Sequence, residues 1–542
     1  MLRIGCKKYL TVMTLVMAAT VTISSQAHAS DPFFSCDGLK KPGPNDDMLA
    51  TDPERGQTAL WSEPRAWVGS LDEQGVVACD IALADSRLKP TYVQRRANLL
   101  QAKAAHLMGA GRIDDALANL EASDRVGLDY PAKQFSQGIG LGNRILRGIA
   151  LSLTGKNEDA AGELDKALLT RPWASSVALQ AARVLFPKSN AAQRLNLLKR
   201  AAVLNPDVSI AGMALALQLG DFQTANAMGV GPAPEPLPVF QGYRDPASVD
   251  TEARRILRNA DRTGMHAYAL CALARCGEAR AEMDAFESSL HQSQVSAKTQ
   301  KGPTSSALST VHQKSSATIA AWRQLIVLRD EIKNVPLTPE LLARLGEEPQ
   351  QVKIVLSDLL NQTARSVGSK RDTAIATIVE TNDSALLKQG STQINLDVPA
   401  EFYALPDVET SIIRVRYRPT TKGILSLGSG FTVYNTDKID ELGIYFIDFD
   451  ASKASIEEAA LYAAAVLAKS KGFDAFVVTY NGSLSRKVSG SFVQANMGRA
   501  AYLRFKCLNR AAKDSSVTDY GFRVIGADDV IFGVKNNLRY LE

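Results

Sequence analysis

Histidine is scarce in this chain of 542 residues, which contains only five. Four lie beyond the N-terminal segment, at His106, His266, His291 and His312, and none lies within residues 393–542. Hydrolases of the Ser-His-Asp and Cys-His types need an imidazole base in a shaped pocket. The lack of histidine therefore argues against both types of enzyme in the C-terminal part of the chain.

A strong excess of charge is also lacking. The formal net charge is +5, and residues 1–29 contribute Arg3, Lys7 and Lys8 without any acidic residue, so the rest of the chain carries +2 (5 − 3 = 2). Proteins that bind nucleic acid usually show a basic patch or a high net positive charge. We therefore expect no nucleic-acid partner.

Long apolar runs are absent apart from one at the N-terminus, where Leu10 to Ile23 is followed by Ala27-His28-Ala29. A basic start, an apolar core and a final A-x-A motif are typical of a secretory signal peptide. We predict a signal peptide over 1–29, cleavage after Ala29, a periplasmic location and no transmembrane span after cleavage. The alternative is a retained anchor, but several threonines leave the run shorter than the roughly 20 residues that a span needs.

Cysteine is also infrequent, with six in the chain and five after the predicted cleavage point. In an oxidising compartment Cys36 and Cys79 can tie the N-terminal segment (30–83) together, and Cys271 and Cys276 are close enough for a local disulfide. Two buried free thiols are the alternative for the second pair. A zinc site needs four ligands and no second pair lies nearby, so we expect no cofactor. The surroundings of Cys507 predict a buried strand.

What the chain does contain is a recurring pattern of small and bulky residues within 84–230. One copy consists of Gly148, Leu151, Gly155, Ala160, Leu164, Ala167 and Pro172. The pattern recurs 34 residues later at Ala182, Leu185, Leu198, Ala201 and Pro206, with Arg194 as the one mismatch, and 44 residues earlier at Ala104, Leu107, Gly111 and Ala116. Small residues let two antiparallel helices approach closely, glycine suits the turn, and proline cannot continue the second helix.

This pattern resembles the tetratricopeptide repeat, which carries small residues where its helices cross and a proline after its second helix. The resemblance implies stacked helix pairs that form a superhelix with a concave inner surface. Such a surface holds peptides or protein segments, so we expect a protein or peptide partner in the inner groove of the repeats. The alternative is that the repeats only pack against the other domain.

The segments after the repeats differ in composition. Four prolines in GVGPAPEPLPVF end the regular stacking, and periodicity predicts further helices within 231–290. Residues 291–316 are rich in Ser, Thr, Gln and Lys, which favours a flexible linker. Helical periodicity resumes over 317–392.

The last part of the chain, 393–542, has the alternation and the β-branched and aromatic residues of strands. One alanine-rich helix interrupts them, with Ser455 and Glu458 in capping-box spacing and Gly472 as its stop. We predict an α+β domain. The run from this helix into Gly472-Phe473-Asp474-Ala475-Phe476 resembles the small α+β domain of proteobacterial envelope lipoproteins that have no assigned activity.

Two groups of charged residues in this domain are candidate sites. Arg414, Arg416 and Arg418 share one face of a predicted strand, which indicates either an exposed sheet face or a groove for an anionic ligand. Asp448 and Asp450 also share a strand face. They can bind a cation together or serve as a catalytic carboxylate pair, although a solvated strand edge is the simpler interpretation.

Together these patterns predict a multidomain protein in which an all-α, TPR-like superhelix precedes a C-terminal α+β domain. The predicted function is a periplasmic protein-binding scaffold without catalytic activity. The alternative is an envelope enzyme that acts on glycan or peptide through Asp448 and Asp450. A third hypothesis is a purely structural subunit of a larger envelope complex.

Overall fold

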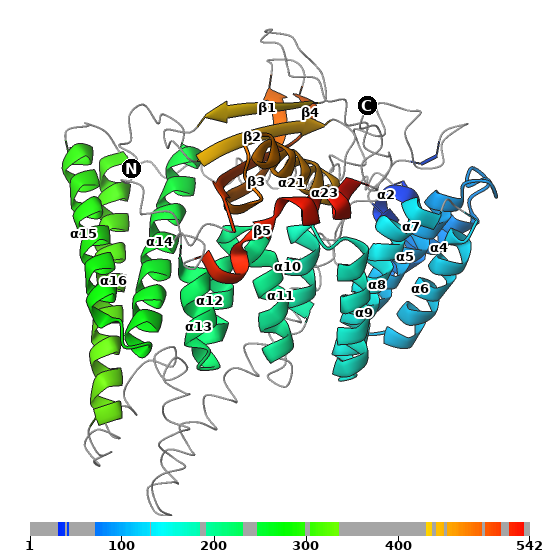
Figure 1. Ribbon diagram of the computed structural model, residues 1–542. Coiled ribbons are helices and arrows are strands. Elements are labelled where there is room, and N and C mark those ends of the chain that lie inside the picture. Colours follow the sequence, from blue (N-terminus) through cyan, green and yellow to red (C-terminus); the bar gives the residue numbers. More distant parts are fainter. Residues whose placement is uncertain are drawn as a thin grey trace, which may run out of the picture.

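The computed structural model consists of a row of helices with a small sheet lying over the helix ends in the middle of the row (Figure 1). It describes residues 31–37, 41–42, 71–129, 132–184, 191–230, 246–298, 304–334, 430–435, 441–448, 453–489, 494–510 and 520–535. The predicted signal peptide lies outside these residues. One continuous apolar core joins the helices from the segment before α4 to the end of α16.

The helices before the sheet follow one another along the row in chain order. Their bounds are α2 (Pro32–Asp37), α4 (Glu73–Ala84), α5 (Val93–Gly109), α6 (Ile113–Gly127), α7 (Ala132–Gln137), α8 (Ile139–Leu153), α9 (Asn157–Thr170), α10 (Ser175–Val184), α11 (Ala191–Leu204), η2 (Pro206–Val208), α12 (Ser209–Gln218), α13 (Phe222–Gly229), α14 (Pro246–Ala272), α15 (Cys276–Lys298) and α16 (Thr304–Asn334). Consecutive helices pack as antiparallel hairpins, α5 with α6, α8 with α9, α10 with α11, α12 with α13 and α14 with α15.

Four of these hairpins share one turn geometry. In the α5–α6 turn, the Arg112 N–H donates to the Leu107 carbonyl (2.8 Å) and the Gly111 N–H donates to the Met108 carbonyl (3.0 Å), which is a Schellman motif. The same pair of hydrogen bonds closes the other three turns. The residue with a left-handed backbone is a glycine in three of them and Ala274, with φ of 63°, in the fourth. The recurring turn explains why glycine recurs at Gly111 and Gly155.

The structure also shows how the predicted repeat positions pack. Gly148 lies against Leu164, and a Cβ added at Gly148 would be 3.0 Å from the Leu164 side chain, so the glycine permits the close approach of α8 and α9. Leu151 is half-buried, Pro172 is exposed directly after α9, Pro206 begins η2, and Leu185 lies outside the described residues. The remaining non-glycine positions are buried, namely Ala104, Leu107, Ala116, Ala160, Leu164, Ala167, Ala182, Leu198 and Ala201.

Arg194, the mismatch in the pattern, has a structural role of its own. Its Nε donates to the Ala182 carbonyl in the last turn of α10 (3.1 Å), where helix carbonyls lack partners within the helix. Burial lowers the pKa of Arg194 to about 10. The arginine therefore joins the two helices of its hairpin by a hydrogen bond instead of by close approach.

Exchanging Ala274 for glycine should stabilise the protein. A left-handed alanine costs roughly 1–2 kcal/mol, and the more flexible unfolded chain of the glycine variant offsets roughly half of the gain. We expect Ala274→Gly to raise the free energy of unfolding by about 0.5–1 kcal/mol in urea titrations. Gly155→Ala, at the equivalent place in the α8–α9 turn, should lower it by a similar amount, about 0.5–1 kcal/mol, because an added Cβ there meets no atom within 4 Å and only the backbone is strained. If Ala274→Gly and the parent chain were equally stable, backbone strain at Ala274 would be contradicted.

The linker predicted over 291–316 is wrong for most of its length. Residues 291–298 belong to α15, and residues 304–316 form the first turns of α16, which continues without a break to Asn334. The composition is polar, yet Val311, His312 and Ser315 are buried on the face of α16 that packs on its neighbours. The polar first part of α16 gains its stability from tertiary packing and from the apolar helix that it continues into, which local composition does not reveal.

The C-terminal part is a five-stranded sheet with helices on one face, so the prediction of an α+β domain is confirmed. Its elements are β1 (Gly430–Asn435), β2 (Glu441–Asp448), α21 (Lys453–Ser470), β3 (Ala475–Ser489), β4 (Gln494–Leu508), η3 (Gly521–Arg523), β5 (Ile525–Gly526) and α23 (Ala527–Lys535). The strand order is β1-β2-β4-β3-β5, and all pairs are antiparallel. Alternate residues of β4, including the free cysteine Cys507, are buried against α21.

The helix α21 differs from its prediction at one end. It begins at Lys453, two residues before Ser455, so Ser455 is not its N-cap residue. Glu458 instead pairs with an arginine of the helical row, as described below. At the other end Gly472 has φ of 84°, and the Phe473 N–H donates to the Ala468 carbonyl, so the predicted stop is confirmed.

Both cysteine pairs singled out in the sequence are bonded. Cys36 of α2 joins Cys79 of α4, and Cys271 joins Cys276 across the turn that contains Ala274. Next to the first disulfide, Arg95 and Asn98 of α5 donate to the two carboxylate oxygens of Asp37, each at 2.9 Å. The segment that directly follows the predicted cleavage point is therefore built into the fold.

Candidate functional site

The α+β domain lies over those ends of the middle hairpins at which the chain passes from one hairpin to the next (Figure 1). Arg171, directly after α9, pairs with Glu458 of α21 through two contacts, Nη2 to Oε2 at 3.1 Å and Nε to Oε1 at 3.4 Å. Both side chains are fully buried. A third contact runs from Arg171 Nη1 to the Gln137 carbonyl at 3.4 Å. The ion pair therefore connects the helical row and the α+β domain at a point that is fully buried.

The next two connections between hairpins meet the same domain. The Leu204 carbonyl at the end of α11 accepts a hydrogen bond from the Asn481 side chain of β3 (2.8 Å). The Val230 carbonyl after α13 accepts from Arg523, which also donates to the Val478 carbonyl. Burial lowers the pKa of Arg523 to about 10. The ends of three successive hairpins are thus occupied by the chain itself, and a partner has to bind elsewhere.

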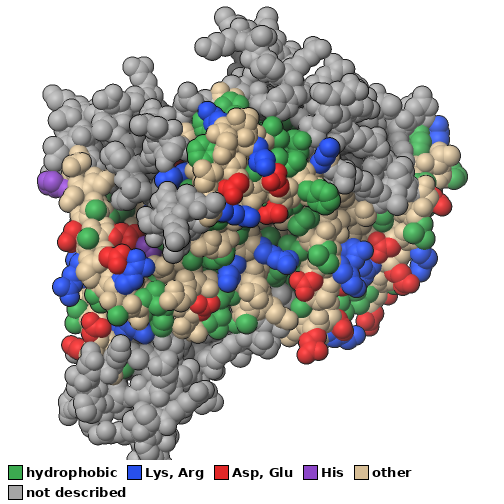
Figure 2. Space-filling view, in the orientation of Figure 1, with side chains coloured by type: hydrophobic (Ala, Val, Ile, Leu, Met, Phe, Trp, Pro, Cys, Tyr) green, Lys and Arg blue, Asp and Glu red, His purple; other side chains and the backbone are tan. Residues whose placement is uncertain are grey.

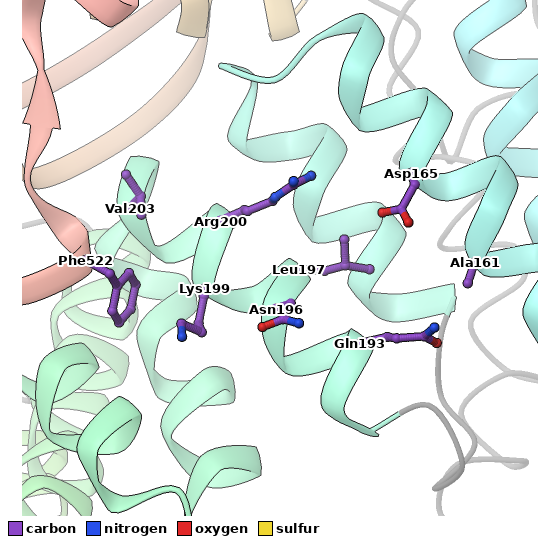
Figure 3. A pocket seen from close by; sticks show the side chains of 9 residues that line it. All are labelled: Ala161, Asp165, Gln193, Asn196, Leu197, Lys199, Arg200, Val203 and Phe522. Carbon is purple, nitrogen blue, oxygen red and sulfur yellow. The ribbon is translucent and has the colours of Figure 1, made fainter.

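A pocket of about 420 Å³ opens beside this interface, between α9 and α11. Its lining residues are Ala161 and Asp165 from α9, Gln193, Asn196, Leu197, Lys199, Arg200 and Val203 from α11, and Phe522 from η3 (Figure 3). Most of the α11 residues recur at helical spacing, which places them on one face of the helix. We call this feature the α9–α11 trough.

The trough has an apolar floor and polar walls. Leu197 is 4% exposed, whereas Gln193, Asn196 and Arg200 are exposed. Within the part of the chain that the structure describes, the side chains of these three polar residues form no hydrogen bond. Their donors and acceptors are therefore free to pair with a ligand.

The charge of the trough is positive. Lys199 and Arg200 provide two cations against the single carboxylate of Asp165. Lys199 Nζ lies 5.1 Å from the centre of the Phe522 ring, a cation–π contact that holds the lysine at the edge of the trough. In the space-filling view, Lys and Arg side chains gather over α11 just below the sheet (Figure 2). The site therefore favours an acidic ligand.

The lining of the trough offers charged and hydrogen-bonding groups. Its nine lining residues include no histidine, cysteine, serine or threonine. The side chains of Asn196 and Gln193 each offer one donor group and one acceptor, as a peptide bond does. This arrangement suits an extended acidic segment of another protein.

The candidate sites predicted in the α+β domain are only partly covered by the structure. Arg414, Arg416, Arg418 and Asp450 lie outside the described residues. Asp448 is the last residue of β2, opposite Arg499 of β4 in the strand register. The sequence alone did not identify the trough residues. The polar residues of α11 have the spacing of any exposed helix face, and no local pattern joins them to Asp165 or to the distant Phe522.

Among the described residues no helix is long and apolar enough to cross a membrane.

Searches with the chain against protein-family models, curated proteins and solved structures found no match. Comparison with known proteins therefore gives no independent assignment.

Proposed function

We propose that the protein is an exported, periplasmic scaffold without catalytic activity, whose α9–α11 trough binds an extended acidic segment of a partner protein. The observation that carries the proposal is a positively charged trough whose amide and guanidinium side chains form no hydrogen bond with the described residues. Acidic side chains of the partner would pair with Lys199 and Arg200, while Gln193 and Asn196 would pair with its backbone.

The recurring hairpins support the TPR-like part of the proposal. First helices of neighbouring hairpins pack on each other, α5 on α8, α8 on α10 and α12 on α14, more closely than the second helices do. A row packed more tightly on one layer bends toward that layer, as in a superhelix. The trough lies in the layer of second helices, so it is distinct from the inner groove predicted from the sequence, which stays a prediction.

The two disulfides support export. Disulfides form and persist in oxidising compartments such as the periplasm and are rare in the cytosol. Both are present here, and one of them fixes the helix that follows the predicted cleavage point.

Reversing one charge in the trough should weaken the binding of acidic peptides. We expect an immobilised peptide array to be bound more strongly as the number of glutamates rises and less strongly as salt is added. Arg200→Glu should weaken binding at least about tenfold, a loss of about 1.4 kcal/mol. The matched control is Arg125→Glu on α6, an exposed arginine away from the trough. Equal binding by the parent chain and Arg200→Glu would refute the trough as the site, and binding that is insensitive to glutamate content would refute the ligand class.

A further inference from the structure

A second pocket, of about 380 Å³, lies between the neighbouring helices α15 and α16 (Figure 1). Each helix contributes one stripe of side chains at helical spacing. The lining residues are Glu287, Leu290 and His291 of α15 and Ser309, His312, Gln313 and Ser316 of α16. The pocket is separate from the trough and from the interface with the α+β domain, so an inference about it does not rest on the proposed function.

The seam between the two helices is polar at this point. Leu290 is the one apolar residue of the lining, whereas helices usually meet through apolar side chains. Within the described part of the chain, the polar side chains of the two stripes form no hydrogen bond with each other. Arg323 of α16 donates to Asp284 (2.6 Å) and Glu287 (2.8 Å) of α15, and these ion pairs join the helices beside the pocket. The remaining polar groups of the lining are therefore available to a ligand.

His312 is the unusual residue of this pocket. It is 3% exposed, and neither ring nitrogen has a hydrogen-bond partner among the described residues. Burial lowers the pKa of His312, so the imidazole is neutral at pH 7 and offers one N–H donor and one acceptor nitrogen. A buried polar group without a partner costs free energy. It therefore points to a partner inside the pocket, either a ligand or water.

The chemistry of the lining indicates a ligand that is polar and neutral. Glu287 is the one carboxylate of the lining, Arg323 offsets its charge, and no Lys or Arg lines the pocket. An anion or a cation would therefore find no unpaired counter-charge there. The two serine hydroxyls, the amide of Gln313 and the neutral imidazole of His312 each both donate and accept hydrogen bonds. The hydroxyl groups of a sugar also do both, so a sugar matches this set of groups.

We propose that the α15–α16 pocket binds a neutral sugar, free or at the end of a glycan chain, through hydrogen bonds to His312, Gln313 and the two serines. The acceptor nitrogen of His312 would receive one sugar O–H, and its N–H would donate to a second sugar oxygen. The exposed side chains of Ser309, Gln313 and Ser316 would pair with the outer hydroxyls. A volume of about 380 Å³ falls within the range of small-molecule sites, about 300–1,000 Å³.

Saturation-transfer NMR titrations of the full mature protein test the proposal. The probes are glucose, galactose, N-acetylglucosamine and its tetramer, with glucuronic acid and glucosamine as charged counterparts. We expect at least one neutral sugar to bind, and tighter binding of the tetramer than of N-acetylglucosamine would identify a glycan chain as the source of the ligand. Equal affinities would identify a free sugar.

Two variants and a matched control locate the site. His312→Phe and Gln313→Ala should each weaken binding of the neutral sugar at least about tenfold, the effect of losing one or two hydrogen bonds. His312→Phe should be at least as stable as the parent without sugar, because phenylalanine fills similar space without an unpaired polar atom. Gln292→Ala removes an exposed glutamine of α15 outside the lining and should bind as the parent does.

Three outcomes would overturn the proposal. The first is that no neutral sugar binds the parent chain, which would leave water as the partner of His312. The second is unchanged binding by either His312→Phe or Gln313→Ala, which would place the sugar elsewhere. The third is tighter binding of glucuronic acid or glucosamine than of glucose, which would contradict a neutral ligand. Because Gln313 is exposed, Gln313→Ala should fold even where His312→Phe does not.

Discussion

Replacing Arg171 by alanine should lower the free energy of unfolding by roughly 3–5 kcal/mol. The substitution removes one partner of a fully buried ion pair and leaves the Glu458 carboxylate buried without its counter-charge. Because Arg171 and Glu458 belong to the helical row and the α+β domain respectively, the loss should appear as separation of the two parts before either unfolds. Urea titration followed by tryptophan fluorescence is suited to this, since Trp173 packs at the same interface.

Two further variants make this prediction sharp. The double variant Arg171→Met with Glu458→Met should regain most of the lost stability, because an apolar pair of similar volume carries no desolvation penalty. Arg112→Ala removes an ion-paired but exposed arginine and should change stability little, since solvent screens such pairs. The proposed role of the Arg171–Glu458 ion pair would be contradicted if Arg171→Ala were as stable as the parent chain. It would also be contradicted if the double variant were no more stable than Arg171→Ala.

Removing the Cys36–Cys79 disulfide should cost about 4 kcal/mol, whereas removing Cys271–Cys276 should cost about 2 kcal/mol. The difference follows from loop closure in the unfolded chain, because the sequence separations are 43 and 5 residues. The longer loop also holds α2, whose Phe33 and Asp37 are buried against α4 and α5. We therefore expect α2 to detach first when the longer disulfide is lost.

The measurement compares Cys36→Ser/Cys79→Ser with Cys271→Ser/Cys276→Ser by urea titration, and follows hydrogen exchange in α2. Addition of dithiothreitol to the parent chain should reproduce the sum of both losses. Cys507→Ser, at the free cysteine of the described residues, serves as the control without a disulfide and should leave the sensitivity to reductant unchanged. If the two double variants lost the same free energy of unfolding, loop closure in the unfolded chain would not determine how much each disulfide stabilises the protein.

Much of the local architecture can be predicted from the sequence because it depends on neighbouring residues. Gly155 and Gly472 end helices in left-handed turns as expected, since glycine alone adopts this backbone without a steric penalty. Gly148 permits the close crossing of α8 and α9. The alternation along β4 fixes which side chains are buried under α21, because strand side chains alternate between faces.

The failed predictions share a physical cause. The segment 291–316 is polar, yet most of it is helical because it belongs to α15 and α16, which pack on α14 and on each other. Glu458 has the spacing of a capping residue but pairs with Arg171, which lies 287 residues away in the sequence. In both cases a tertiary contact outweighs a local preference of about 1 kcal/mol or less.

The helix pairs, their glycine turns, the cysteine pairs that can bond and the presence of a separate sheet follow from local sequence, because each depends on residues a few turns apart or on composition. Three features appear only in the folded chain: the α+β domain covers the ends of the hairpins, Phe522 joins α9 and α11 in one trough, and His312 is buried without a hydrogen-bond partner among the described residues. Burial and long-range pairing depend on the packing of the whole chain, and no local pattern of residues records them.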